Sequence, residues 1–189
     1  WAGVQSLPRE LSLDETGHLV SRPIDEVKTL RKELYSLPEL VLEQRSKHEI
    51  PVAGRHMALA LTLETPDSGL EIDLLASPDG MEKVSIRLAS GGNQLEMDLR
   101  ASSRVDGLQK PCLAVDFPEH TSDVRTLQIY IDGSVIEVWV DERIVLTGRA
   151  YPKAEKATGL YLSSIEGLAK IQNLQVWNME AIWPTSDEM

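Results

Sequence analysis

Apolar residues recur at every second position in several runs between residues 57 and 117. A period of two is typical of strands that bury one face, whereas a helix repeats its apolar residues every three to four positions. The runs cover residues 57–63, 70–74, 84–88, 95–99 and 113–117. This pattern predicts many short, half-buried strands.

Turn signals separate these runs at nearly regular spacing. They include Ser77-Pro-Asp-Gly80, Ser90-Gly-Gly-Asn93 and Asp106-Gly107, and their Gly and Asn residues accept backbone angles that bulky side chains avoid. Two further apolar runs, 159–163 and 168–177, would complete the sheets. We therefore predict an all-β fold, an antiparallel two-sheet β-sandwich of the lectin-like jelly-roll type.

One segment near the N-terminus has a helical pattern instead. Pro23 suits a first helical turn, and Asp25 and Glu26 complement the helix dipole. Apolar residues at positions 27, 30 and 34 then follow at helical spacing. A helix of one or two turns is predicted within residues 23–34.

Residues 127–140 predict a β-hairpin. Asp132-Gly133 suits the positive φ of a two-residue type I′ turn. If Ile131 faces Ser134 across this turn, Gln128 lies opposite Glu137 on one face of the hairpin. We therefore expect Glu137 to form a cross-strand polar pair with Gln128.

A second reversal is predicted at Asp141-Glu142, followed by a strand over residues 143–149. A turn of two residues places Ile144 and Leu146 on the same side as Trp139. The central strand would then be covered on both faces, unlike an exposed edge strand.

The net charge excludes some partners. The chain has 189 residues, of which 30 are acidic and 19 basic, and its formal net charge is −11. This charge repels phosphate backbones and anionic membrane surfaces, and no apolar run reaches the roughly 18 residues of a transmembrane span. Neither nucleic acid nor a membrane is an expected partner.

Metal-binding and disulfide signals are absent from the sequence. The single cysteine, Cys112, opens the apolar run 112–115 and is predicted to be a packed thiol. The four histidines are scattered, with no His-Glu-x-x-His motif and no paired cysteines, so no metal site is predicted. Ser6, Ser134 and Ser163 lack a nucleophile elbow, which leaves no sign of a serine hydrolase.

Several acidic residues could be considered for catalysis. Asp132, Glu137 and Asp141 lie close in the sequence, but Asp132 suits a turn and Glu137 a cross-strand pair. We interpret them as structural. Acids at positions 71, 73, 96 and 98 alternate along half-buried strands and are interpreted as a solvated sheet face.

Two motifs resemble a known family. The order Asp132-x-Ser134-x-x-Glu137, then Arg143, Thr147-x-Arg149 and Tyr151-Pro152, resembles the C-terminal β-sandwich of glycoside hydrolase family 32, the invertases, inulinases and levanases. Residues 1–11, WAGVQSLPREL, resemble a segment of the last blade of that family's five-bladed catalytic propeller. Residues 19–31 resemble the linker between propeller and sandwich. Trp139 departs from the family, which commonly has Phe there.

The resemblance implies a domain organisation. Residues 1–18 would be a remnant of the last propeller blade, 19–36 a linker with a short helix, 37–183 the sandwich and 184–189 a frayed tail. Asp132, Ser134, Glu137 and Arg149 would form a structural motif of the sandwich. Arg9 and Glu10 are expected to form an ion pair near the domain junction.

The resemblance also implies a function for the parent protein. It would hydrolyse terminal β-fructosyl bonds of sucrose, inulin or levan with retention, by two carboxylates about 5 to 5.5 Å apart and without metal or organic cofactor. The family's catalytic motifs, Asn-Asp-Pro-Asn, Glu-Cys and Arg-Asp-Pro, do not occur here. No catalytic residue is therefore predicted in this chain, which would support the propeller. Trp1 would help to wall the fructose pocket in the intact parent.

A carbohydrate-binding module is the alternative function. Its stacking rings would be Tyr130, Trp139, Tyr151, Tyr161 and Trp177, although strand aromatics more often pack in cores. Loss of the propeller would expose Val4 and Leu7, so self-association is expected. The sequence has no Asn-x-Ser/Thr acceptor, which favours a bacterial source; a cytoplasmic and a secreted location both fit.

Overall fold

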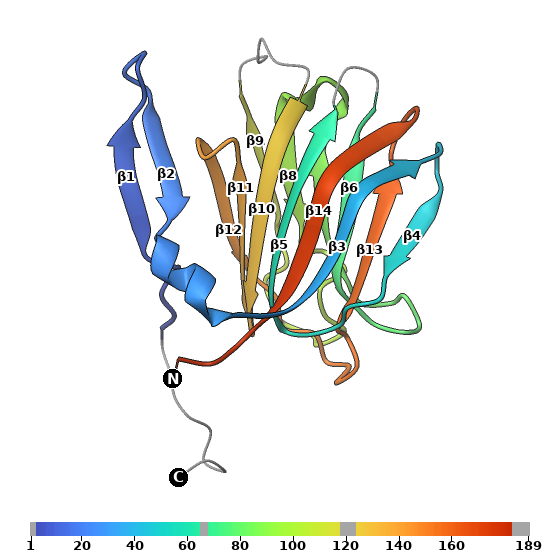
Figure 1. The fold of residues 1–189 in the computed structure, drawn as a ribbon. Helices are drawn as coiled ribbons and strands as arrows, with labels where there is room; N and C mark the ends of the chain where they lie inside the picture. Colours follow the sequence, from blue (N-terminus) through green and yellow to red (C-terminus); the bar gives the residue numbers. More distant parts are fainter. Residues whose placement is uncertain (1–2, 65–67, 118–123, 183–189) are drawn as a thin grey trace.

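The computed structural model describes residues 3–64, 68–117 and 124–182. Two six-stranded antiparallel sheets pack face to face, and a two-stranded hairpin lies beside them (Figure 1). The predicted all-β, two-sheet sandwich is confirmed. No helix of the described residues is long and apolar enough to cross a membrane.

The first sheet has the strand order β12-β11-β10-β5-β14-β3, and the second has the order β4-β13-β6-β7-β8-β9. The strands of the first sheet are β12 (Ile144–Arg149), β11 (Val135–Val140), β10 (Val124–Asp132), β5 (His56–Glu64), β14 (Ala169–Met179) and β3 (Arg31–Leu42). Those of the second sheet are β4 (Lys47–Ile50), β13 (Gly159–Ser164), β6 (Leu70–Ala76), β7 (Val84–Leu88), β8 (Gln94–Asp98) and β9 (Cys112–Asp116).

The core lies between the two sheets. Alternate residues of β5 point into it, including Leu59 and Leu63, and they meet the inner face of β6 and β7, which includes Ile72 and Ile86. All four side chains are buried. Burial of apolar surface, worth about 25 cal/mol per Å², is the main stabilisation of such a core. The period of two in the sequence arises because alternate residues of each strand point into this core.

We call residues 3–30 the N-terminal segment. It contains the hairpin strands β1 (Arg9–Leu13) and β2 (Leu19–Pro23) and the 3₁₀ helix η1 (Asp25–Leu30); a second 3₁₀ turn, η2 (Ser90–Gly92), connects β7 to β8. The predicted helix thus exists but ends at Leu30. Leu34 lies in β3 opposite Trp177, because backbone pairing with β14 outweighs the local helical spacing. The first sheet begins at Arg31, inside the range expected to be linker.

The register of the β10–β11 hairpin differs from the prediction by two residues. Ile131 pairs with Ile136 and Asp132 with Val135, so the turn consists of Gly133 and Ser134. Gly133 has a φ of 58°, and Gly at the first central position is typical of a type II′ turn. Asp132 stays in the strand because it pairs with His56 of β5. Glu137 consequently lies opposite Tyr130, not Gln128.

The reversal after β11 occurs where it was predicted, but it contains one more residue. Asp141 and Glu142 have φ values of 51° and 54°, and Val140 pairs with Ile144. One extra residue flips every following side chain to the other face, so Trp139 faces Val145 and the expected placement of Ile144 and Leu146 is wrong. All six residues of β11 are buried, which confirms that this strand is covered on both faces.

Cys112 is a further correction. Its side chain is exposed, whereas its strand neighbours Leu113 and Val115 pack against the core. Alternation along β9 explains the difference, because successive residues of a strand point to opposite faces.

Candidate docking surface on the first sheet

The outer face of the first sheet carries buried aromatic residues, and the N-terminal segment covers them. Tyr130, Trp139 and Trp177 form a cluster with Val27 of η1, and we call these three rings the aromatic cluster. Leu7 and Ile24 of the N-terminal segment pack against it. The outer face is thus closed by chain that precedes the sandwich.

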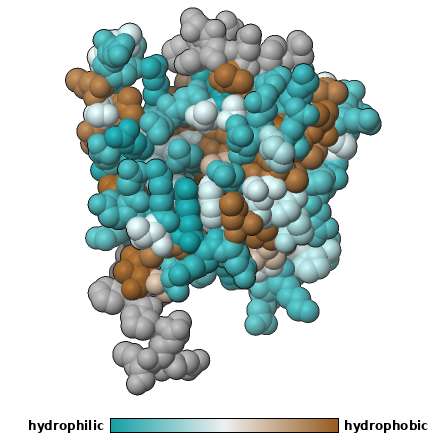
Figure 2. Space-filling model, viewed as in Figure 1, coloured by the Kyte–Doolittle hydropathy of each residue, from teal (hydrophilic) through white to brown (hydrophobic). Residues whose placement is uncertain are grey.

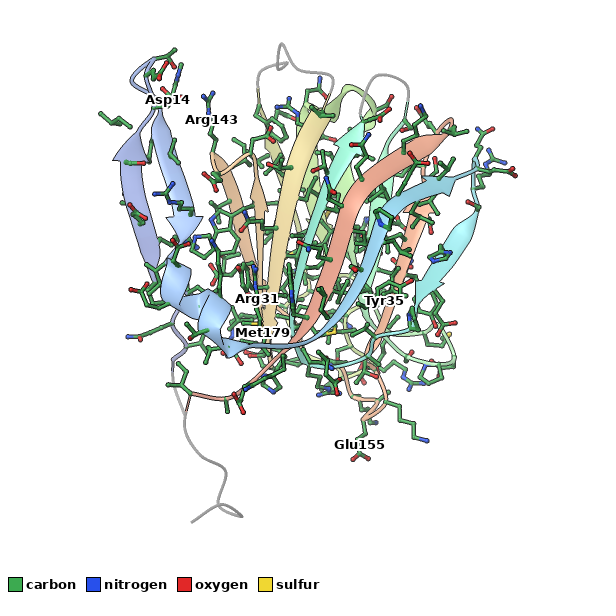
Figure 3. All side chains as sticks on the ribbon, in the orientation of Figure 1. Asp14, Arg31, Tyr35, Arg143, Glu155 and Met179 are labelled. Carbon is green, nitrogen blue, oxygen red and sulfur yellow. The ribbon has the colours of Figure 1, made fainter. Side chains whose placement is uncertain are left out.

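Two arginines extend the aromatic cluster. Tyr130 and Trp139 meet edge to face with ring centroids 5.7 Å apart. Arg9 lies over Trp139 at 5.3 Å from the ring centroid, and Arg31 lies over Trp177 at 3.8 Å. Arg31 also donates to the Tyr130 hydroxyl at 3.2 Å; Figure 3 labels Arg31 where the chain enters β3. Cation–π contacts of this kind are worth about 0.5 to 2 kcal/mol.

Glu137 is the charged residue at the centre of this surface. Its side chain is 2% exposed. One carboxylate oxygen accepts from the backbone N–H of Leu7 at 2.6 Å, and the other accepts from Arg9 Nη2 at 2.5 Å and from the Thr147 hydroxyl at 3.2 Å. Burial of a carboxylate is costly unless it is paired and hydrogen-bonded. Two of these donors belong to the N-terminal segment.

The tip of the β1–β2 hairpin makes a second attachment. Asp14 pairs with Arg143 from the turn after β11 (Figure 3), and the Ser21 N–H donates to the Glu142 carbonyl at 2.7 Å. Asp14 accepts from the Thr16 hydroxyl and from the backbone N–H groups of His18 and Thr16, and these bonds with Arg143 lower its pKa to about 2. The N-terminal segment is therefore attached both within β11, at Glu137, and at the turn that follows β11.

The structure brings two of the four predicted motif residues, Asp132 and Ser134, to one depression, and Glu137 lies apart from them within β11. Asp132 is exposed and lies 2.9 Å from His56 Nδ1. The Ser134 carbonyl accepts from the Ala150 N–H, and Arg149 lies over the Tyr151 ring. An open depression of about 660 Å³ is lined by Asp132, Ser134 and Tyr151, together with Val4 and Arg55. Among these motif residues, Glu137 is the one whose side chain is hydrogen-bonded to Leu7 and Arg9 of the N-terminal segment.

The three acids considered for catalysis are also separated. Asp132 and Asp141 lie at opposite ends of β11, and Glu137 lies within that strand. Asp141 accepts from Arg125 at 2.7 Å and from the Thr126 N–H. Each acid has its own partners, which fits the structural interpretation. Trp1, the proposed substrate contact, lies outside the described residues.

Sequence reasoning missed the partners of Arg9. Arg9 pairs with Glu137, and Glu10 pairs with Arg22 at 3.0 Å; the expected Arg9–Glu10 pair does not form, because successive residues of a strand point to opposite faces. Arg9 and Glu137 are 128 positions apart in the sequence, so no local pattern indicates that they are in contact. The Pro-Arg-Glu run and the Asp132-x-Ser134-x-x-Glu137 motif were the signals that could have linked them.

The outer face of the second sheet is different in kind. We call it the charged face, and it comprises Lys47, Glu71, Asp73, Lys83, Arg87, Glu96 and Asp98. Asp73 is 2% exposed and accepts from Lys83, Lys47 and Ser85 at 2.9, 3.1 and 2.7 Å. Burial alone would raise the pKa of Asp73, but these bonds outweigh burial and lower it. The acids of this face were predicted to be solvated, but the structure shows that they form partly buried ion pairs.

One group of potential metal ligands lies at the edge of the charged face. The ligand atoms of Glu96, Asp98 and Cys112 lie within 4.8 Å of one another. Arg87 bonds both carboxylates, and Arg100 bonds Asp98 at 2.7 Å. Burial and the neighbouring Glu96 raise the pKa of the Cys112 thiol, whereas metals bind the thiolate. The guanidinium groups already neutralise these acids.

Comparison with known proteins gives a consistent result. The family model described as glycosyl hydrolases family 32 C terminal matches residues 26–178. Sucrose-6-phosphate hydrolase of Escherichia coli is 26% identical over 184 residues, which are 95% of this chain and 35% of that protein. Raffinose invertase of Escherichia coli is 28% identical over 181 residues, 94% of this chain and 35% of that protein.

Among solved structures, fructan 1-exohydrolase IIa from Cichorium intybus superposes with a TM-score of 0.81 at 22% identity, over 95% of this chain and 42% of that one. At this identity the likeness shows the fold. The chain spans about a third of the length of the two Escherichia coli relatives.

Proposed function

The chain belongs to glycoside hydrolase family 32, as the C-terminal domain of its β-fructosidases, and we propose that it supports the catalytic part of a longer polypeptide without turnover of its own. The observation that carries this proposal is the N-terminal segment. Its residues 3–25 precede the range matched by the family model, yet they are fixed to the sandwich by Glu137 and Arg143.

The hairpin of the N-terminal segment supplies supporting evidence. Leu11, Leu13 and Leu19 are 57–69% exposed, and the pairing of Leu13 with Leu19 places all three on one face. Figure 2 shows hydrophobic residues at this hairpin, at the left of the view. An isolated two-stranded hairpin is marginally stable. We propose that preceding strands of the catalytic propeller cover this face, with residues 1–18 as the end of its last blade.

The activity of the parent follows as part of the proposal. It would cleave terminal β-fructosyl bonds of sucrose, inulin or levan with retention, by two carboxylates that precede this chain. Relatives are named sucrose-6-phosphate hydrolase, raffinose invertase and levanase, which supports fructosides as the substrate class. Trp1 would contribute a wall of the fructose pocket there.

The test is a fructose-release assay with the purified chain on sucrose, inulin and levan, with a whole family 32 invertase as positive control. No release above buffer is expected from the chain. Turnover by the pure chain would overturn the proposal. A second measurement tests whether the chain stabilises the catalytic part. The isolated catalytic part should melt at a lower temperature than the same part within the whole protein. Equal melting temperatures would contradict a supporting role.

Binding of carbohydrate is the second candidate function. Tyr130, Trp139 and Trp177 are buried, which removes three of the five proposed stacking rings. Tyr161 remains half-buried beside a depression of about 380 Å³ with Lys47 and Lys83, and this observation keeps the hypothesis testable. Tyr151 is also exposed, so two rings remain available. Calorimetric titration with fructo-oligosaccharides would favour this function if a dissociation constant of about 1 mM or tighter appeared and Tyr161→Ala or Tyr151→Ala weakened it, and a titration without heat would contradict it.

Self-association of the chain as given is a further consequence. Val4 is exposed as expected, but Leu7 is not, because it packs against the aromatic cluster. The three exposed leucines on one hairpin face form an apolar patch in its place, and such a patch tends to find a partner. Light scattering is expected to show an increase of average mass with concentration, and Leu11→Ser with Leu13→Ser should reduce it. A monomer at high concentration would contradict this expectation.

A further inference from the structure

Glu137 contacts two donors that are only two positions apart in the N-terminal segment. The Leu7 N–H reaches one carboxylate oxygen and the Arg9 guanidinium reaches the other. Between them stands Pro8, which has no N–H to donate, and its carbonyl accepts from the Ile24 N–H. The two oxygens therefore recognise a backbone donor followed, two residues later, by a cation.

This pattern occurs in one register of the segment. If the segment slid by one residue so that Pro8 replaced Leu7, the first oxygen would lose its donor and Glu10 would replace Arg9. A slide in the other direction would replace Arg9 by Pro8 and leave the carboxylate without a cation. A buried carboxylate without partners costs several kcal/mol, so both slipped arrangements are disfavoured.

Neighbouring contacts reinforce the same register. Thr147 of β12 donates to Glu137 and accepts from Arg9 at 3.1 Å, and Arg9 stacks on Trp139. The Leu7 side chain borders a cavity of about 410 Å³ that Val27 and Met179 also line. The polar contacts at Leu7 and Arg9 thus favour one register, because each needs a particular donor, whereas apolar contacts are not directional.

We propose that Glu137 is a positioning residue that sets the register of the N-terminal segment on the first sheet, and with it the placement of the catalytic part proposed above. The proposal rests on the proposed function, because a catalytic part joined at this segment is what the register would place. Arg9 is the partner through which Glu137 acts.

The test is amide hydrogen exchange of the 189-residue chain, followed residue by residue by NMR. Glu137→Gln keeps the size of the side chain but replaces one acceptor oxygen by an NH₂ group. This donor would then face another donor, either the Arg9 guanidinium or the Leu7 N–H. Exchange of the Leu7 amide is expected to accelerate by about tenfold or more, while amides of β5 and β14 change by less than about twofold.

Glu10→Gln is the matched control. It removes a carboxylate from the same segment, but the Glu10–Arg22 pair is about half exposed, so exchange of the Leu7 amide should stay within about twofold of the unmodified chain. In an Arg9→Gln background, Glu137→Gln should accelerate Leu7 exchange by less than about threefold, because the two residues act as a pair.

Two results would overturn the proposal. Leu7 exchange within about twofold of the unmodified chain in Glu137→Gln would show that the carboxylate does not hold the segment. Equal acceleration in β5 and β14 would show a role in global stability alone. Either result leaves the proposed function standing, whereas fructose release by the pure chain would overturn that function without affecting the register of the segment.

Discussion

The outer faces of the two sheets both contain buried carboxylates, but the groups that pair these carboxylates come from different parts of the chain. On the first sheet, the Glu137 carboxylate receives donors from residues 128 and 130 positions away, in a segment that lies across the sheet. On the charged face, Asp73 and Glu71 are paired by Lys47, Lys83 and Arg87, which lie 10–26 positions away on or next to neighbouring strands.

The difference shows which face needs a partner. The charged face neutralises its acids within the second sheet, so it can remain open to water. The first sheet presents three large rings and one buried carboxylate, and these are covered only when the N-terminal segment is in place. The outer face of the first sheet is therefore the one that depends on residues from outside the sandwich, and the N-terminal segment supplies them.

The largest expected effect comes from the aromatic cluster. Trp139→Ala should lower the free energy of unfolding by about 3 to 5 kcal/mol, because it removes a buried ring and leaves a cavity. Tyr161→Ala on the charged face is the matched change and should cost clearly less, since that ring is half-buried. Urea denaturation measures both; equal losses would remove the contrast between the faces.

Removal of the buried acid of the charged face should have a smaller effect. Asp73→Asn leaves Lys83 and Lys47 without their shared charged acceptor and should cost about 2 kcal/mol in the free energy of unfolding. Glu96→Gln on the same face serves as control and should cost about 0.2 to 1 kcal/mol. A loss for Asp73→Asn no larger than for Glu96→Gln would show that burial does not matter there.

Acid should weaken the charged face through Asp73. Its pKa is lowered in the folded protein, whereas an unfolded Asp titrates near about 3.9. The ionised carboxylate therefore stabilises the fold above about pH 4, and this contribution is lost as the pH falls through the folded pKa. Urea denaturation at pH 5 and pH 3, which lie about one unit above and about one unit below the unfolded value, should show a larger loss for the unmodified chain than for Asp73→Asn. Parallel losses would contradict the assignment.

The smallest effect is expected at the exposed pair of the hairpin. Glu10→Gln removes the pairing with Arg22 and should change the free energy of unfolding by at most about 1 kcal/mol. High salt should reduce even this difference, because at about 1 M the screening length falls to about 3 Å. A larger, salt-independent loss would mean that hairpin charges matter as much as Glu137.

Much of the fold was predictable from local sequence. The period of two identified the strands whose residues fill the core, such as Leu59 and Ile72, and the turn residues identified where most of them end. The motifs around Asp132 and Trp1 indicated the family, and the match over residues 26–178 confirmed it. The site was harder to predict. The sequence singled out Glu137 but gave Gln128 as its partner, whereas the structure pairs Glu137 with Leu7 and Arg9.

By itself, the sequence determined which residues are half-buried, that the chain folds as an antiparallel sandwich, and to which family it belongs, because these depend on alternation and on short motifs. Tertiary structure decided the register of β10 and β11, which residues of β12 lie on the same side as Trp139, and the donors of Glu137. A single residue in a turn inverts a whole strand, and in β10 the pairing of Asp132 with His56 of β5 extends the strand and leaves Gly133 and Ser134 as the turn.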